Sequence, residues 1–160
     1  MARACDPMSR EGVRAVAARD ASIQCIFCRI VRGEAPSHPV YEDEHTLAFM
    51  DIAPVSDGHV LVIPRAHGAT IFEVGAEDAA AVARGAKRVA HALREVLSPP
   101  GLMVGQLNGE AAGQTVFHYH VHLIPRREGD ALRIHGRGPA RPERLAELAA
   151  SLRAALAKVP

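Results

Sequence analysis

Three histidines alternate with aromatic or apolar residues between Val116 and Pro125, at His118, His120 and His122. This alternation has the two-residue period of a β-strand, so a strand over residues 117–124 would turn all three imidazoles toward one face. Along such a strand the first and last histidine would lie roughly 13 Å apart, too far to bind one zinc ion together at bond lengths of ~2 Å. The spacing therefore predicts that the three side chains divide their roles.

A row of neutral histidines that faces a pocket is suited to nucleophilic attack on phosphorus. One ring nitrogen attacks, the other gives its proton to an acceptor that fixes the tautomer, and neighbouring groups protonate the leaving group. Two other interpretations compete with this one. The row is either the polar face of an edge strand, or a cupin-like metal site, which would need a glutamate three or four residues further on. Glu128 lies too far along the chain for that role, beyond Pro125.

The loop before the histidine row contains the residue types that bind a phosphate. Glycines such as Gly109 and Gly113 let backbone N–H groups approach an anion, and Gln114 and Thr115 add side-chain donors. Alone, this segment is typical of a hairpin turn. Directly before the row, it predicts a phosphate or oxyanion site beside His120.

The composition excludes several classes of protein. The chain has 160 residues, which fits one domain, and its 48% apolar content occurs in short runs, none long enough to span a membrane. A net charge of +1 and 4% aromatic residues disfavour nucleic acid as a partner. Three cysteines, with Cys25 and Cys28 in a Cys-x-x-Cys pair, indicate metal or redox chemistry rather than a secreted disulfide framework. We expect a cytoplasmic protein.

The elements that must position these residues form an α+β pattern, with an antiparallel sheet and helices on one side. One helix begins after Gly75, with acidic residues in its first turn, and ends before the prolines Pro99 and Pro100. A second helix begins at Pro142. The turn residues of segment 53–58 predict a hairpin between the first two strands. We expect strands over residues 46–52, 59–64, 102–107 and 117–124.

At several points the sequence resembles the histidine-triad superfamily of nucleotide hydrolases and transferases, in its zinc-containing bacterial branch. The resemblance covers about two thirds of the chain, in the family's order. Its motifs are Cys-Ile-Phe-Cys-Arg-Ile-Val at 25–31, Val-Tyr-Glu-Asp-Glu at 40–44, Leu-Ala-Phe-Met-Asp-Ile at 47–52, Gly-His-Val-Leu-Val-Ile-Pro-Arg-Ala-His at 58–67, and the block from Asn108 through the histidine row.

The resemblance implies a fold and a division of the chain. The fold would be a five-stranded antiparallel sheet with one long helix packed on it and a C-terminal helix, and the sheet of such proteins usually extends across a homodimer. We therefore expect a flexible extension over residues 1–22, the histidine-triad domain over 23–127, and a linker and helix over 128–160.

The resemblance also implies a mechanism. His120 would attack the α-phosphorus of a purine nucleotide to form a nucleotidyl-histidine, which water would release as a nucleoside monophosphate. The substrate would be a nucleoside phosphoramidate or a dinucleoside polyphosphate. By the same similarity, His122, Gln114 and Thr115 would bind phosphate or the leaving group, Asp51 the ribose hydroxyls, and His59 would lie near the phosphates. The remaining expected nucleotide contacts are Phe27, Ile30, Phe49, Ile52, Asn108 and Gly113.

A structural zinc site also follows from the resemblance rather than from the cysteine pair alone. In the zinc-containing branch, two histidines complete the set, and they correspond here to His67 and to His118, the first of the row. The four ligands would be Cys25, Cys28, His67 and His118, and the chemical step would require no metal.

Three other functions remain open from the sequence. A nucleotidylyl transferase or phosphorylase would pass the nucleotide from His120 to an acceptor other than water. A nucleotide-binding regulatory protein would have only incidental activity. A purely structural zinc-stabilised module would leave Gln114 and Thr115 without a phosphate to bind.

Overall fold

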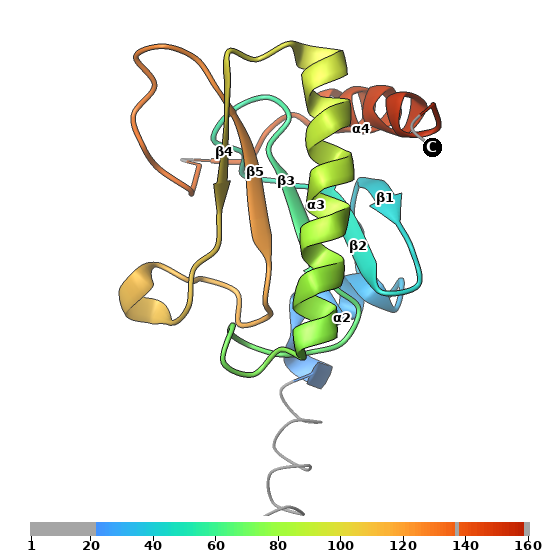
Figure 1. The fold of residues 1–160 in the computed structure, drawn as a ribbon, viewed down its shortest axis with the longest axis vertical. Coiled ribbons are helices and arrows are strands. Elements are labelled where there is room, and N and C mark those ends of the chain that lie inside the picture. Colours follow the sequence, from blue (N-terminus) through green and yellow to red (C-terminus); the bar gives the residue numbers. More distant parts are fainter. Residues whose placement is uncertain (1–21, 137, 159–160) are drawn as a thin grey trace, which may run out of the picture.

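The computed structural model describes residues 22–136 and 138–158, so the expected extension over 1–22 lies outside them except for its last residue. These residues form an α+β domain with one antiparallel sheet in the order β1-β2-β3-β5-β4, which confirms the expected fold class (Figure 1). In chain order the elements are α2 (Ile26–Val31), β1 (Pro39–Glu42), β2 (Thr46–Met50), β3 (Val60–Pro64), α3 (Ala76–Leu97), β4 (Gly101–Gly105), the 3-10 helix η1 (Glu110–Ala112), β5 (Val121–Arg126) and α4 (Pro142–Leu156).

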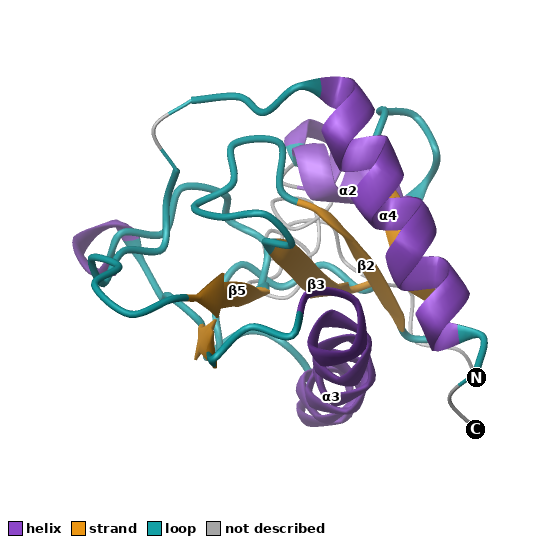
Figure 2. Cartoon of the chain, turned by 90° about the horizontal axis from the view of Figure 1, so that it is seen from above, coloured by secondary structure: helices purple, strands orange, loops and turns teal. Residues whose placement is uncertain are grey.

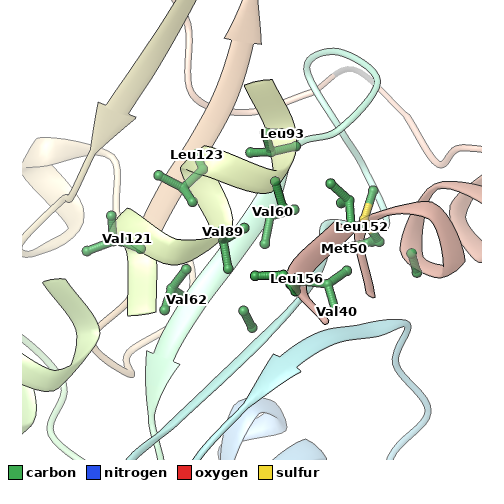
Figure 3. Packing of buried hydrophobic residues seen from close by; sticks show 14 of the residues in the cluster. Val40, Met50, Val60, Val62, Val89, Leu93, Val121, Leu123, Leu152 and Leu156 are labelled. Carbon is green, nitrogen blue, oxygen red and sulfur yellow. The ribbon is translucent and has the colours of Figure 1, made fainter. Parts of the chain in front are cut away.

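The centre of the sheet is buried on both faces. Along β3, Val60 and Val62 point into a core shared with α3 and α4, whereas Leu61 and Ile63 pack with Phe27 of α2 on the opposite face. Figure 3 shows the first of these cores. A strand buried on both sides reads as a continuous apolar run, as this one does. The β2–β3 hairpin over the turn at 53–58 is antiparallel, as predicted.

Helix α3 occupies the predicted span. Val82, Val89 and Leu93 recur at helical spacing and are fully buried, and each such side chain contributes roughly 1.5–3 kcal/mol through burial. Figure 2 shows α3 lying along one face of the sheet. The helix ends at Leu97 and is capped by Ser98, whose backbone is left-handed with φ of 43°, directly before Pro99.

Helix α4 begins at Pro142, as predicted, and packs against α3 and β1. The expectation that all helices lie on one side of the sheet is wrong for α2, which covers the other face. Its six residues are too few to show a helical repeat in the sequence. The β1 strand was also not recognised as a separate element from its composition.

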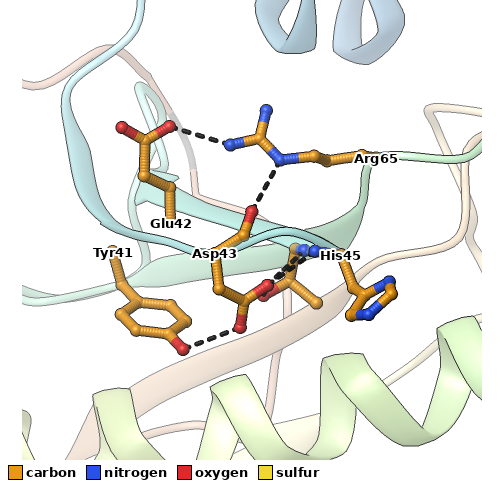
Figure 4. Close-up of polar contacts among 6 residues, drawn as sticks. Tyr41, Glu42, Asp43, His45 and Arg65 are labelled. Carbon is orange, nitrogen blue, oxygen red and sulfur yellow. Dashed lines mark hydrogen bonds and ion pairs between the residues drawn. The ribbon is translucent and has the colours of Figure 1, made fainter.

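The turn between β1 and β2 is organised by Asp43. Its Oδ1 accepts hydrogen bonds from the N–H groups of His45 and Thr46 and from the Thr46 hydroxyl, while Tyr41 donates to Oδ2 at 2.7 Å (Figure 4). Burial acts to raise the pKa of this carboxyl, but the donated hydrogen bonds outweigh it and hold the pKa below its ordinary value. Arg65 fastens the same turn to the end of β3 through the Asp43 carbonyl oxygen.

The histidine row differs from its predicted strand. Strand β5 begins only at Val121, so His122 lies in the sheet while His118 and His120 precede it. The reason is that Tyr119 N–H donates to the Gly68 carbonyl oxygen at 2.6 Å instead of joining the ladder, which draws this segment toward the loop after β3. The apolar alternation still holds, because Tyr119, Val121 and Leu123 reach the helical core.

The other strand ends also differ slightly from the prediction. Strand β2 ends at Met50 rather than Ile52, β3 begins at Val60 rather than His59, and β4 spans Gly101–Gly105 rather than 102–107. Within the described residues, no helix has both the length and the apolar character needed to cross a membrane.

Candidate functional site

Two cysteines and two histidines from three separate segments meet at one point. Cys25 and Cys28 come from the start of α2, His67 from the loop after β3, and His118 from the segment before β5. One ligand atom from each lies within 4.8 Å of every other. The structure therefore brings together all four residues of the predicted metal set.

The spacing of these atoms fits a tetrahedral ion. The Cys28 Sγ atom lies 3.2 Å from His67 Nδ1 and 3.5 Å from His118 Nδ1, and Cys25 Sγ lies 3.6 Å from His118 Nδ1. A zinc ion with bonds of 2.0–2.3 Å would separate its ligands by roughly 3.3–3.8 Å. These three separations are close to those around such an ion, and all four ligand atoms lie near enough to one another to share it.

The environment of His118 also suits a metal ligand. Its Nε2–H donates to the Pro64 carbonyl oxygen at 2.9 Å, which leaves Nδ1 deprotonated and facing the cysteines. Burial lowers the pKa of His118 to about 4, so the ring is neutral at neutral pH. Burial, with the neighbouring Cys25, raises the pKa of the Cys28 thiol to about 12, so binding a cation there would displace a proton.

The hydrogen bonds of His120 assign its tautomer. Its Nδ1–H donates to the His118 carbonyl oxygen at 2.6 Å, so the lone pair resides on Nε2. The side chain is 3% exposed and lines a pocket, and burial lowers its pKa, so the ring is neutral. A neutral imidazole with one nitrogen held by a carbonyl has the arrangement that a nucleophile requires.

His122 has the opposite tautomer, set by His59. His59 Nδ1 accepts a hydrogen bond from Val55 N–H at 3.1 Å, so its Nε2 carries the hydrogen and donates to His122 Nδ1 at 2.9 Å. The neutral His122 ring must then carry its hydrogen on Nε2. That buried atom has no hydrogen-bond partner among the described residues. An unsatisfied buried donor costs about 1–3 kcal/mol, which an external acceptor such as a phosphate oxygen would recover.

Burial keeps this pair of histidines uncharged. It lowers the pKa of His59 to about 4, with Asp51 acting in the opposite direction, and it lowers the pKa of His122 to about 3, reinforced by the neighbouring histidines. The Asp51 Oδ2 atom lies 3.5 Å from His59 Nε2, and its Oδ1 accepts a hydrogen bond from Ala53 N–H. Asp51, His59 and His122 thus form a row of neighbouring polar side chains at one wall of the pocket.

The pocket has a volume of about 400 Å³, which is ample for a nucleoside monophosphate. One end is apolar, where the rings of Phe27 and Phe49 meet edge to face at 5.4 Å between centroids. The polar end holds the histidines and Thr115. Eight of the predicted site residues line it: Phe27, Ile30, Phe49, Asp51, Ile52, Thr115, His120 and His122.

Three predicted contacts do not line the pocket. Gln114 is buried, donates to the carbonyl oxygens of Ala69 and Val116, and accepts from Gly109 N–H. Asn108 accepts from Ile71 N–H at 2.7 Å. Gly113 has a positive φ of 90° in the same loop. In this structure Gln114 and Asn108 hold the loop in shape, and their role as nucleotide contacts stays a prediction.

Sequence analysis missed His135 and Gly136, which line the pocket from the segment between β5 and α4. That segment has neither a strand nor a helical period, and it was interpreted as a linker. The only signal in the sequence was a histidine within a stretch rich in glycine and arginine.

Comparison with known proteins places this geometry in a family. Residues 32–129 match the HIT domain family. The zinc-bound histidine triad family protein from Mycobacterium smegmatis superposes with a TM-score of 0.75 at 42% identity, covering 86% of this chain and 96% of that one. A hypothetical histidine triad nucleotide-binding protein from Sulfolobus tokodaii gives a TM-score of 0.77 at 34% identity, covering 84% and 93%.

A relative with a named activity is also similar. The Arabidopsis thaliana protein named adenylylsulfatase HINT3 is 39% identical over 108 residues, which is 68% of this chain and 55% of that protein. The match over residues 32–129 and the agreement of the fold with these structures confirm the resemblance inferred from the motifs between Cys25 and the histidine row. This chain belongs to the HIT domain family.

Proposed function

We propose that this protein is a nucleotide hydrolase that cleaves at the α-phosphate of a nucleoside phosphoramidate or dinucleoside polyphosphate through a nucleotidyl-His120 intermediate. The observation that carries this proposal is the pair of opposite tautomers in the pocket. His120 offers a lone pair on Nε2, and His122 offers a buried Nε2–H that has no partner in the described part of the chain. Attack on phosphorus needs one of each, a nucleophile and a donor to the phosphoryl oxygen.

The first step follows from these positions. His120 Nε2 attacks phosphorus while its Nδ1–H remains bound to the His118 carbonyl oxygen, which stabilises the positive charge that develops on the ring. His122 Nε2–H donates to a phosphoryl oxygen, and the bond from phosphorus to the leaving group breaks. Water then attacks phosphorus, the bond to His120 breaks, and a nucleoside monophosphate is released.

The lining of the pocket supports a purine nucleotide as substrate. The apolar end formed with Phe27, Ile30 and Phe49 suits a base, and Ile52, which also lines the pocket and is 65% exposed, would contact the base. Asp51, another lining residue, suits the ribose hydroxyls. The Sulfolobus neighbour, described as nucleotide-binding, and the plant adenylylsulfatase are consistent with this substrate class.

We also propose zinc as the ion held by the four ligands Cys25, Cys28, His67 and His118. The donor set supports it, since two thiolates and two imidazoles in tetrahedral spacing favour zinc, and the Mycobacterium neighbour is zinc-bound. With four protein ligands such an ion would have no open position, so its part would be to fix the backbone at His118, which carries the carbonyl that orients His120.

The proposal also covers the oligomeric state of the protein and its location in the cell. We expect a homodimer in the cytoplasm, with no membrane or nucleic acid as partner. Strand β4 is an edge of the sheet, its Val104 is 59% exposed, and an apolar groove of about 250 Å³ lies between this edge and α3. An unpaired edge beside an apolar groove is suited to pairing with a second copy.

Replacement of the nucleophile tests the function. The His120→Ala variant should lose turnover of adenosine 5′-phosphoramidate and of diadenosine polyphosphate by at least 10³-fold while still binding AMP. In the wild-type protein, rapid quenching and intact-mass measurement should detect an added adenylyl group. The exposed histidine variant His45→Gln is the matched control. Full activity in His120→Ala would contradict the mechanism, and ADP formation with added phosphate would reassign the enzyme as a phosphorylase.

A further inference from the structure

The segment between β5 and α4 brings a third imidazole to the polar end of the pocket, beside those of His120 and His122. His135 is half-buried, lines the pocket, and donates its Nε2–H to the Gly113 carbonyl oxygen at 2.7 Å. The Gly113 loop leads directly to Thr115, which lines the same end. The contact therefore joins the C-terminal part of the chain to the loop before the histidine row.

The segment is held in place on both sides of His135. Ala140 N–H donates to the Ile52 carbonyl oxygen at 2.9 Å, and a Cβ on Gly136 would clash with the Ala53 carbonyl oxygen. On the other side, Ile134 packs so closely on Gly105 of β4 that a Cβ there would lie 2.9 Å from its Cδ1. These contacts fix the His135 ring at the pocket wall.

Four ring side chains that line the pocket each lie close to the next. The centroid of Phe27 lies 5.3 Å from that of His120, His120 lies 4.9 Å from His122, and His122 lies 5.7 Å from His135. A phosphate bound by His120 and His122 would therefore lie beside the His135 ring. With the base against Phe27, this places the leaving group within reach of His135.

The hydrogen bonds of His135 suit it to donate a proton. Because a carbonyl oxygen only accepts, Nε2 must carry a hydrogen, and the other nitrogen, Nδ1, has no partner among the described residues. His135 reaches solvent, so a protonated ring would remain partly hydrated there, unlike the fully buried His59 and His122. In that form Nδ1–H is the atom available to a ligand.

We propose that His135 is the general acid for the leaving group, an inference that rests on the proposed function. As His120 Nε2 bonds to phosphorus, the phosphorus–nitrogen bond of a phosphoramidate breaks, and its electron pair takes the proton from His135 Nδ1. The amine departs neutral and His135 becomes neutral. In the second step water attacks phosphorus, its proton passes to His135 Nδ1, and the bond between phosphorus and His120 breaks.

The test compares two leaving groups on the same nucleotide. An alkylamine in an adenosine 5′-phosphoramidate must be protonated as it leaves, whereas 4-nitrophenolate in the adenosine 5′-phosphate ester leaves as a stable anion. In His135→Gln, whose amide can still donate to the Gly113 carbonyl oxygen, kcat/KM for the alkylamide should fall about 10²-fold to 10³-fold. With the 4-nitrophenyl ester it should fall less than about 5-fold.

The controls distinguish a general acid at His135 from a role in the shape of the pocket and from failure of the proposed function. His45→Gln should match the wild-type enzyme on both substrates. An equal loss on both substrates in His135→Gln would show a role in the shape of the pocket and overturn the proposal, as would an unchanged rate with the alkylamide. If the wild-type protein turns over neither substrate, the proposed function itself fails before any variant is compared.

Discussion

His59 Nε2 lies 2.9 Å from His122 Nδ1, and this contact decides which nitrogen of His122 carries its hydrogen. The His59 ring is fully buried and its other nitrogen accepts a hydrogen bond from Val55 N–H, so the direction of the hydrogen bond is fixed from behind. Orientation of one imidazole by another polar group is the same principle that operates in catalytic triads.

Removal of His59 should therefore impair catalysis without removing a group that contacts substrate. His59→Phe keeps much of the buried volume but no longer donates to His122 Nδ1, so both His122 tautomers become accessible. We expect kcat for adenosine 5′-phosphoramidate to fall about 10-fold to 100-fold, with a smaller change in the Kd for AMP. Steady-state kinetics measure kcat, and calorimetric titration measures the Kd. An unchanged kcat in a folded variant would contradict the role of His59 in orienting His122.

The metal set predicts a stoichiometry and a stability effect. Cys28→Ser and His67→Ala should purify without the one equivalent of zinc expected in the wild-type protein. If the variants lose a few kcal/mol of the free energy of unfolding with the metal, Tm should fall by roughly 10 °C for a chain of this size. Elemental analysis and thermal unfolding measure the effect. His45→Gln is the control because the exposed His45 is not among the four clustered residues, and equal zinc in all the variants would contradict the proposed metal site.

Buried neutral histidines predict how stability depends on pH. The pKa values of His59 and His122 fall from an ordinary 6.5 to about 4 and about 3 on folding. Below pH 6.5 the unfolded chain therefore binds protons that the folded chain does not. The contribution of these two histidines to the free energy of unfolding is complete above about pH 6.5 and is lost as the pH falls toward 4. Urea unfolding at several pH values should show this slope, and it should be shallower in His59→Phe than in His45→Gln.

Asp43 predicts a second dependence on pH, at lower values. Its folded pKa lies below the ordinary 3.8, so its stabilising effect is present above that value and is lost as the pH falls further. Asp43→Ala removes three acceptor contacts at Oδ1 and one at Oδ2 and should destabilise the β1–β2 hairpin by about 1–3 kcal/mol at pH 7. Chemical unfolding measures this, with the exposed variant Glu44→Ala as control.

Gly136 predicts a steric requirement at the pocket wall. A methyl group added there would meet the Ala53 carbonyl oxygen and lie 2.5 Å from the Pro54 carbonyl oxygen, so Gly136→Ala must displace the segment that carries His135. We expect KM and kcat to change together, with kcat/KM lowered about 10-fold or more. Gly138→Ala, where a Cβ has open space, is the control, and identical kinetics in the two variants would contradict the close packing.

Prediction from the sequence succeeded where a period or a stop signal was strong. The spacing of Val82, Val89 and Leu93 and the prolines after Leu97 identify α3, and Pro142 identifies the start of α4. Alternation was less specific, because it persists through His118 and His120, whose backbone lies outside the ladder. An alternation with a period of two residues indicates which way the side chains point. It does not indicate whether the backbone pairs with an adjacent strand.

The candidate site was predictable to the extent that its residues lie in short motifs. Cys25, Cys28, His67 and His118 are brought together as the resemblance implied. Gln114 and Asn108 could not be placed, because an amide side chain satisfies a nearby backbone group as readily as a ligand. His135 could not be found because its partner, Gly113, is 22 positions away and contributes only a carbonyl.

The carbonyl oxygen that holds His120 belongs to His118, so one peptide group is shared between the metal cluster and the nucleophile. Because this acceptor is a main-chain carbonyl oxygen, replacing a side chain does not remove it. Its position changes only if the contacts that hold residue 118 in place change. The rate of the proposed reaction should consequently depend on whether Cys25 and Cys28 are reduced and bound to the proposed zinc. Oxidation of the two thiols would then slow the reaction at His120, although neither cysteine lines the pocket.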